Sequence, residues 1–337
     1  MNRVRDSLGG LADDIERLSA DVGHRVRVDV DAVLSPIDTE GRTAPGVVSA
    51  NGACRLIRAK DGWIAVNLPG PLDHPIVPAW IGCAPDAEPW AAIGKSARGR
   101  PWRELVDTAA QAGLAVAGVG EITAQTPHPF LHRMAPGAAR RAGRPLKVID
   151  LSSLWAGPFA GAVLARAGAQ VTKIESQAAP DALRTAAPET FERLNGGKEE
   201  VALDFDDPED QARLTVVVAE ADVIITSAGP AAMARIGLTP QAAFKYRPSL
   251  VWIAVTGYGW MSQNADRRAY GDDAAAAGGL VRWGPKGAPN FIGHALADPI
   301  AGFAAAAAGL DAMRQGGGFL VDAPLARTAA DVAGRAA

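Results

Sequence analysis

From residue 147 onward, short apolar runs alternate with stretches of helical periodicity. The runs 148–151, 170–174, 223–225 and 250–255 predict strands, and the stretches 157–166, 208–220 and 240–244 predict helices. This alternation is typical of a parallel sheet built from right-handed crossovers. We therefore predict an α/β fold whose main part is a doubly wound, Rossmann-like parallel sheet. A ligand is expected beyond the carboxyl ends of the strands, in the loops after Leu151, Ile174, Ile225 and Val255.

The first 140 residues follow a different pattern. Residues 4–21 carry apolar side chains at helical spacing and predict an amphipathic helix that needs a partner surface: Val4, Leu8, Leu11, Ile15 and Leu18. Two apolar runs, 54–57 and 63–66, flank a Lys-Asp-Gly turn and predict a hairpin. Helices at 89–97 and 102–112 and a strand at 114–119 complete the prediction of a small α/β unit. The predicted domains are an N-terminal helical segment (1–45), a small α/β domain (46–140) and a Rossmann-like domain (145–337).

Composition narrows the classes of function. The chain has 337 residues, 48% hydrophobic and 21% charged, with a net charge of −3, which suits a globular protein acting on small molecules. Scattered Lys and Arg residues give no basic surface, so no nucleic-acid partner is expected. The apolar stretch 300–313 is too short for a bilayer core of about 30 Å and predicts a buried helix, so no membrane partner is expected either. We expect a cytoplasmic location, because no secretory signal is seen.

Cysteines and histidines suggest no metal site. Cys54 and Cys83 have no metal-ligand spacing and are interpreted as packing residues, and the five histidines are equally scattered. A dinucleotide site is also disfavoured. The loop after the first strand has only Gly157 and Gly161 of a G-x-G-x-x-G pattern, although Glu175 ends the second strand where a ribose-binding acid would lie.

A series of segments closely resembles the family III coenzyme A-transferases, which include formyl-CoA and carnitine CoA-transferases and 2-methylacyl-CoA racemases. The series begins with VIDLSSLWAGPFAGAVLARAGAQVTKIES and continues in the family's order with LNGGKEEVALDFDDPE, ADVIITSAGPAAMARIGL, PSLVWIAVTGYG, RAYGDDAAAAGGL, HALADPIAGFAAAAAGL and GGGFLVDAPL. Upstream, CRLIRAKDGWIAVNL resembles the start of the family's small domain, which normally follows the large one. The order here is permuted, and residues 1–45 match no part of the family.

The resemblance implies an enzyme that moves CoA between an acyl-CoA thioester and a carboxylic acid, through an aspartyl anhydride and an aspartyl-CoA thioester. It implies a homodimer, acyl-CoA and acid as substrates, and no tightly bound cofactor. The nucleophile falls on Asp298, in the segment ALADPIAG. By itself, an Asp before Pro299 and an apolar helix favours an N-cap, and the two roles are compatible. With an ordinary pKa near 3.9 the carboxylate would be ionised and would need no general base.

The resemblance also implies a CoA-binding set: Trp155, Ala156, Lys198, Ser227, Ala228, Arg235 and Arg268. Ala156 matches a residue on the adenine side. Arg235 and Arg268 could pair with CoA phosphates, and Lys198 stands where the family often has a lysine, although a solvated surface charge is the ordinary interpretation of each. The family's usual aromatic after the third matched strand is replaced by Ala228, which removes one wall of the nucleotide site.

Several residues near these segments leave alternatives open. Tyr270-Gly271 replaces the histidine and aspartate of the racemases, which disfavours racemisation, and a catalytically silent CoA-binding subunit is a further alternative. Asp272 and Asp273 could face the site, but their interpretation as solvated turn residues is favoured. His294 could line the site, but its interpretation as a residue at a strand end is favoured. The glycines of 316–318 and 278–279 could stabilise an oxyanion, and plain turns are favoured.

Overall fold

A computed structural model describes residues 1–35, 45–124, 130–138 and 144–334. Its centre is a seven-stranded sheet in the order β4-β12-β9-β8-β5-β6-β7. Only β4 is antiparallel to its neighbour; the other pairs are parallel. The strands are β4 (Phe130–Arg133), β5 (Lys147–Leu151), β6 (Gln170–Ser176), β7 (Glu199–Leu203), β8 (Val223–Thr226), β9 (Val251–Ala254) and β12 (Phe319–Asp322). The predicted doubly wound α/β fold is confirmed.

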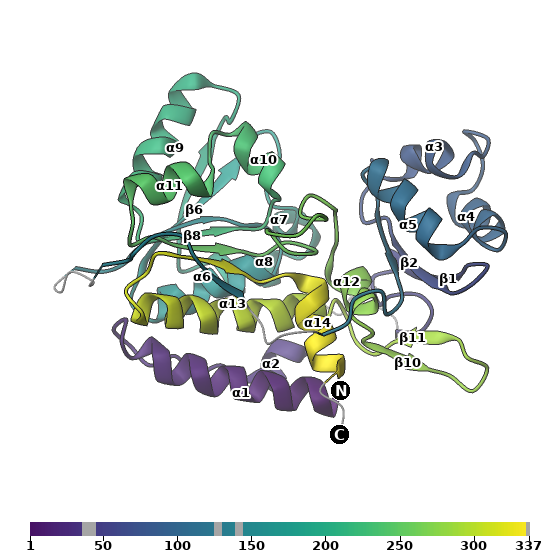
Figure 1. The fold of residues 1–337 in the computed structure, drawn as a ribbon, viewed down its shortest axis with the longest axis horizontal. Helices are drawn as coiled ribbons and strands as arrows, with labels where there is room; N and C mark the ends of the chain where they lie inside the picture. The colour runs from purple at the N-terminus through teal and green to yellow at the C-terminus, as the bar shows by residue number, and fades with distance from the viewer. Residues whose placement is uncertain (36–44, 125–129, 139–143, 335–337) are drawn as a thin grey trace.

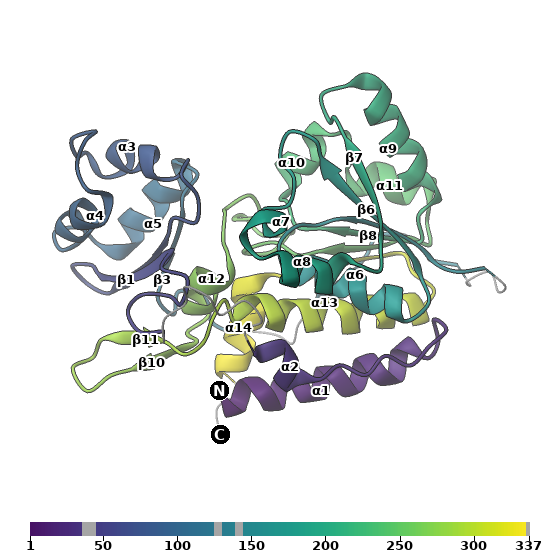
Figure 2. The ribbon, with the colours of Figure 1, turned by 180° about the vertical axis from the view of Figure 1, so that it is seen from behind.

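Helices cover both faces of this sheet (Figures 1 and 2). One face packs against α6 (Ala156–Arg166), α13 (Ala297–Arg314) and α14 (Leu325–Gly334), and the other against α9 (Pro208–Glu220), α10 (Pro230–Arg235) and α11 (Pro240–Tyr246). The central strands β8, β9 and β12 are buried along their whole length, which explains their continuous apolar sequence. Helix α13 is buried on nearly all sides, as the stretch 300–313 predicted.

The N-terminal helix α1 (Asn2–Ser19) finds its partner surface on α13, below the main sheet in Figure 1. Val4, Leu8, Ile15 and Leu18 are buried in the same core as α6 and α13. A short helix, α2 (Val30–Leu34), follows it. The amphipathic pattern of residues 4–21 is therefore confirmed, and α1 forms an outer layer beneath the large domain.

The small unit lies beside the large sheet (Figure 1). Strands β1 (Cys54–Arg58), β2 (Trp63–Asn67) and β3 (Ala115–Gly118) form an antiparallel sheet, and the predicted hairpin is its β1–β2 pair. A separate core holds this sheet against α3 (Val77–Ile81), α4 (Pro89–Ala97) and α5 (Trp102–Gln111), with a 3-10 turn at His74–Ile76. Because β4 pairs with β12, the chain returns to the large sheet before residue 140; the domain boundaries proposed from the sequence stay a prediction.

Several elements escaped the sequence patterns. Among them are the edge strand β7, the pair β10 (Val281–Trp283) and β11 (Pro289–Phe291), and the helices α7 (Leu183–Ala186), α8 (Pro188–Asn195) and α12 (Gly271–Ala277). Strand β7 is mostly exposed and starts with two glutamates, so no apolar run marks it. Helix α12 consists of Gly, Asp and Ala and is buried throughout, so it carries no amphipathic period.

Candidate active site

Two cavities meet at Asp298. The larger, of about 720 Å³, lies between the large domain and the small unit, and the smaller, of about 420 Å³, lies over the loops after β8 and β9. Asp298, Leu154, Trp155, Arg268 and Tyr270 line both. The site therefore lies beyond the carboxyl ends of the parallel strands, where the sequence predicted it.

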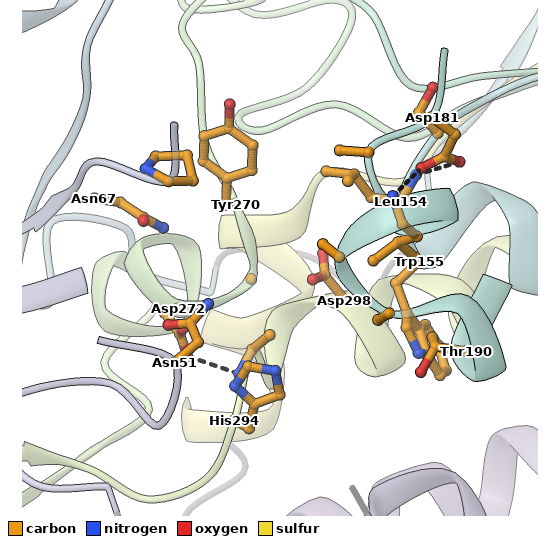
Figure 3. A pocket seen from close by; sticks show the side chains of 18 of the residues that line it. Asn51, Asn67, Leu154, Trp155, Asp181, Thr190, Tyr270, Asp272, His294 and Asp298 are labelled. Atoms are coloured by element: carbon orange, nitrogen blue, oxygen red, sulfur yellow. Dashed lines mark hydrogen bonds between the residues drawn. The ribbon is translucent and has the colours of Figure 1, made fainter. Parts of the chain in front are cut away.

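Asp298 is the second residue of α13, and its carboxylate points into the space between Tyr270, Asp272 and His294 on one side and Leu154 and Trp155 on the other (Figure 3). The N-cap position belongs to Leu296, which makes no side-chain capping bond, so the N-cap interpretation of Asp298 is wrong. The helix begins earlier because Ala295, in a left-handed conformation with φ of +45°, accepts the Asp298 amide at 3.0 Å. The carboxylate is thus left available for chemistry.

The start of α12 packs directly on this carboxylate. A Cβ atom added at Gly271 would collide with Asp298 Oδ2, with the carbonyl oxygen of Ala295 and with the Ala295 side chain. Gly271 is therefore the residue type that lets the first turn of α12 lie against Asp298.

Asp272 and Asp273 are buried, with 4% and 0% exposure, so their interpretation as solvated turn residues is wrong. Asp272 Oδ1 accepts the amide of Ala295 at 2.6 Å and so holds the turn that precedes α13. Asp273 Oδ1 accepts the Asn67 side-chain amide of the small unit at 2.8 Å and the Tyr270 amide at 3.0 Å. The two acids fix the loop and helix that surround Asp298.

The protonation of Asp298 differs from the expectation of an ordinary carboxylate. Burial, and then the charges of Asp272 and Asp273, raise its pKa to about 8. Burial likewise raises the pKa of Asp273 to about 7, with a further contribution from Asp272 and an opposing one from its hydrogen bonds. A raised pKa of this kind runs against the expectation of an ordinary carboxylate that is fully ionised at pH 7.

The opposite wall is the turn after β5, which holds a strained residue. Leu154 has a φ of +67°, and its amide donates to Asp181 Oδ2 at 3.0 Å. The neighbouring Ser153 amide donates to Ser227 Oγ at 2.9 Å. Beneath the turn, the fully buried Lys173 Nζ lies 3.3 Å from Asp181 Oδ2 and donates to Ser152 O at 2.9 Å. A strained backbone supported by a buried ion pair is typical of functional sites.

Most of the predicted CoA-binding residues come together in the smaller cavity: Trp155, Ala156, Ser227, Ala228, Arg235 and Arg268. Trp155 stacks on Phe159 with ring centroids 5.0 Å apart. Arg268 is held between the domains by Asp73 Oδ1 at 3.1 Å, Gly113 O at 2.9 Å and Tyr270 Oη at 2.6 Å. Arg235 is exposed at the end of α10.

Lys198 lies elsewhere. Its side chain is 1% exposed, and Nζ contacts Asp150 Oδ2 at 2.7 Å, Asn195 Oδ1 at 2.8 Å and Pro158 O at 2.9 Å. Burial lowers the pKa of Lys198, with Asp150 opposing the shift, whereas Lys198 and Lys173 together lower the pKa of Asp150 against the effect of its burial. Lys198 therefore joins the start of α6 to strand β5, and it lines neither cavity.

Of the other residues that the sequence suggested for the site, some line a cavity and some lie far from Asp298. His294 lines the larger cavity, in the segment between β11 and α13. The glycines 316–318 follow the far end of α13, about 27 Å along the helix from Asp298 at 1.5 Å per residue, so they cannot serve its oxyanion. Gly278 packs on α14 at the far end of α12. Sequence reasoning missed Asn51, Asn67 and Asp181, because their segments carry no distinctive pattern and only folding brings them to this cavity.

No helix in the described part of the chain is long and apolar enough to cross a membrane. Among these residues no group of His, Cys, Asp and Glu side chains is arranged to hold a metal ion.

Comparison with known proteins identifies one family. Residues 144–337 match the family model described as CoA-transferase family III. The chain belongs to this family. This CoA-transferase family III chain is 31% identical over 199 residues to a succinate–glutarate CoA-transferase of Agrobacterium fabrum, covering 53% of the chain and 50% of that protein. It is 29% identical over 201 residues to a succinyl-CoA–D-citramalate CoA-transferase of Chloroflexus aurantiacus, covering 55% and 50%.

Two solved structures resemble this fold. A CAIB/BAIF family protein from Brucella suis superposes with a TM-score of 0.51 at 29% identity, over 56% of this chain and 54% of that one. A hypothetical protein from Mycobacterium tuberculosis gives a TM-score of 0.52 at 26% identity, over 61% and 58%. This family III chain thus spans about half the length of the curated relatives it matches.

Proposed function

We propose that the protein is a CoA-transferase that moves coenzyme A between an acyl-CoA thioester and a carboxylic acid, with Asp298 as the nucleophile. The observation that carries the proposal is the position of Asp298 at the junction of two cavities. A thioester has two unlike halves, and a nucleophile that attacks its carbonyl must lie between their binding sites. Family membership supports the same activity.

In the proposed cycle, the Asp298 carboxylate attacks the thioester carbonyl, the C–S bond breaks, and an acyl-aspartyl anhydride and CoA thiolate form. The thiolate attacks the aspartyl carbonyl, releasing the donor acid and leaving an aspartyl-CoA thioester. An acceptor carboxylate then attacks that thioester, forming a second anhydride and again freeing the thiolate. Attack of the thiolate on the acceptor's acyl carbonyl gives the new acyl-CoA and restores Asp298.

The smaller cavity suits the CoA half of the substrate. It contains Trp155, Ala156, Ser227, Ala228, Arg235 and Arg268. The exposed guanidinium of Arg235 is placed to pair with a CoA phosphate as a bidentate donor. Arg268 contributes charge while anchored by Asp73 and Tyr270. The acyl group of the substrate would then bind in the larger cavity, on the other side of Asp298.

Because only the ionised carboxylate can attack the thioester, the raised pKa means that Asp298 must lose its proton before the reaction begins. At pH 7 a pKa of about 8 leaves only a minority of the molecules ionised before substrate binds. The buried acids Asp272 and Asp273 hold down this fraction while they fix the geometry. A high pKa also means a more basic and hence more nucleophilic carboxylate once the proton is lost.

The proposal also covers the domain organisation, the oligomeric state and the location of the protein. We propose three parts, residues 1–45, 46–140 and 145–337, with the small domain placed before the large one. A homodimer, which the family resemblance implies, and a cytoplasmic location, which the sequence predicts, are part of this proposal.

The test is to trap the acyl-aspartyl intermediate. Protein is incubated with a panel of acyl-CoA thioesters and hydroxylamine, and the peptide that contains Asp298 is weighed by mass spectrometry. We expect an aspartyl hydroxamate at Asp298, its loss in Asp298→Asn, and its retention in the control Asp311→Asn, which changes an acid near the other end of the same helix. An unmodified Asp298 with every donor, despite measurable CoA binding, would overturn the proposal. Entry of solvent deuterium at the α-carbon would instead support a racemase.

A further inference from the structure

The larger cavity has the size of a site for a bulky ligand. Its volume of about 720 Å³ falls within the range of about 300–1,000 Å³ that encloses drug-sized molecules. The acyl group of a four- or five-carbon acid would leave most of this space to water. The volume therefore favours an acyl group with a ring or a long hydrocarbon chain.

The walls of the cavity are largely apolar and come from both domains. The small unit and the segment before it contribute Val33, Leu34, Pro69, Leu72 and Ile76, and the large domain contributes Leu154, Trp155, Leu183 and Leu296. An apolar acyl group gains about 25 cal/mol for each Å² of surface that it buries here. A charged group gains nothing from such walls and loses its hydration.

The charged side chains of the described lining do not offer a site for a second carboxylate. Its acids are Asp73, Asp181, Asp272 and Asp298, and its basic residues are Arg193, Arg268 and His294. Arg268 is already bound to Asp73, Gly113 and Tyr270, and Asp181 is paired with the buried Lys173 rather than with a cation of the cavity. Arg193 is exposed on α8, where solvent weakens any ion pair it makes. His294 and Arg193 each have another partner in the protein, so a distal carboxylate would meet no buried basic side chain of the described lining that is not already engaged.

We infer that the larger cavity selects a bulky, apolar monocarboxylic acyl group, aromatic or long-chain, over the short dicarboxylic acids for which several relatives are named. This inference rests on the proposed transferase function, since it places the acyl half of acyl-CoA in this cavity.

The experiment measures acyl-CoA binding to the Asp298→Asn protein, which cannot form the anhydride. Isothermal titration compares CoA, 4-phenylbutyryl-CoA and glutaryl-CoA; the thioesters share the nucleotide half, so their difference reports the acyl group. We expect 4-phenylbutyryl-CoA to bind at least about tenfold more tightly than glutaryl-CoA, the low end of what apolar pockets discriminate. Equal or tighter binding of glutaryl-CoA would overturn this inference and leave the transferase proposal standing. Absence of binding by CoA itself would overturn both.

A pair of variants locates the effect in the cavity. Ala186→Trp, at an exposed position of α7 that lines the larger cavity, should weaken 4-phenylbutyryl-CoA binding about tenfold and leave CoA binding unchanged. The control is Thr185→Trp, on the same helix but outside the described lining, and should change neither. If Ala186→Trp leaves both affinities at their original values, the acyl group lies elsewhere and the inference is wrong.

Discussion

At the residue scale, the chemistry depends on how Asp298 is surrounded. The residue lies at a cavity junction, next to Gly271, where burial and then the charges of Asp272 and Asp273 raise its pKa to about 8. Groups that face it from the neighbouring elements include His294 and Arg268, which line the same cavity. A nucleophile of this kind should respond to pH in the physiological range.

We expect the rate of hydroxamate formation at Asp298 to rise with pH through about 8, because the attacking form is the carboxylate. Asp272→Asn keeps an oxygen that accepts the Ala295 amide but removes a negative charge, so the midpoint should move to lower pH. The measurement is the single-turnover trapping rate between pH 6 and 9.5, with a saturating acyl-CoA. Asp311→Asn, which is not a neighbour of the site, should leave the midpoint in place. A rate that is flat over this range, or a midpoint unmoved by Asp272→Asn, would contradict the role assigned to these acids.

Lys198 shows the limit of carrying a role from sequence similarity to one residue. A lysine after an Asn-Gly-Gly turn could equally meet a phosphate, face solvent or pair with a buried acid. The contact with Asp150 depends on a residue 48 positions away, on strand β5, and no local sequence pattern predicts it. Tertiary structure therefore decides between these roles.

At the scale of elements, the site is the meeting point of two helix starts. Helix α12 begins at Gly271 and α13 begins at Ala297, and the turn at Ala295 touches both. Asp272 in α12 binds the Ala295 amide, so the two helices are fixed by a direct contact. Movement of either start would displace the nucleophile from the cavity junction.

Gly271→Ala tests this contact. The added methyl group collides with Asp298 Oδ2 and Ala295 O, so the carboxylate or the turn must shift. We expect trapping at Asp298 to slow by at least tenfold and the free energy of unfolding to fall by about 1–3 kcal/mol. The readouts are the single-turnover rate and urea unfolding.

The control for this substitution is Gly94→Ala in α4, where an added Cβ meets nothing within 4 Å. It should stabilise the protein by about 0.5–1 kcal/mol and leave trapping unchanged, as expected for a glycine inside a helix. Full activity in Gly271→Ala would show that the packing of α12 on Asp298 is not required.

At the scale of the whole molecule, two segments outside the part matched by the family model complete the structure. Helix α1 covers α13 from below (Figure 1). The small unit forms one wall of the larger cavity. Since α13 carries Asp298 at its start, the packing of α1 supports the element that positions the nucleophile.

Removal of one α1 contact should therefore destabilise the large domain. Leu8 is fully buried in the shared core, and we expect Leu8→Ala to lower the free energy of unfolding by about 2–4 kcal/mol. The measurement is urea unfolding followed by tryptophan fluorescence; Trp252 and Trp155 report from the large domain. Asp13→Ala, on the exposed face of the same helix, is the control and should change stability by less than about 0.5 kcal/mol. Similar stability of the Leu8→Ala protein would mean that α1 is a dispensable attachment.

The sequence by itself determined the doubly wound sheet, the hairpin of the small unit, the amphipathic α1 and the position of Asp298 in the series of family segments. These features rest on local periodicity and on ordered matches, both of which can be read along the chain. Only the tertiary structure decided the burial of Asp272 and Asp273, the pKa of Asp298, the ion pair of Lys198 and the cavity built with the small unit. Electrostatic environment and cavity shape arise from residues far apart in sequence, and folding brings those residues together.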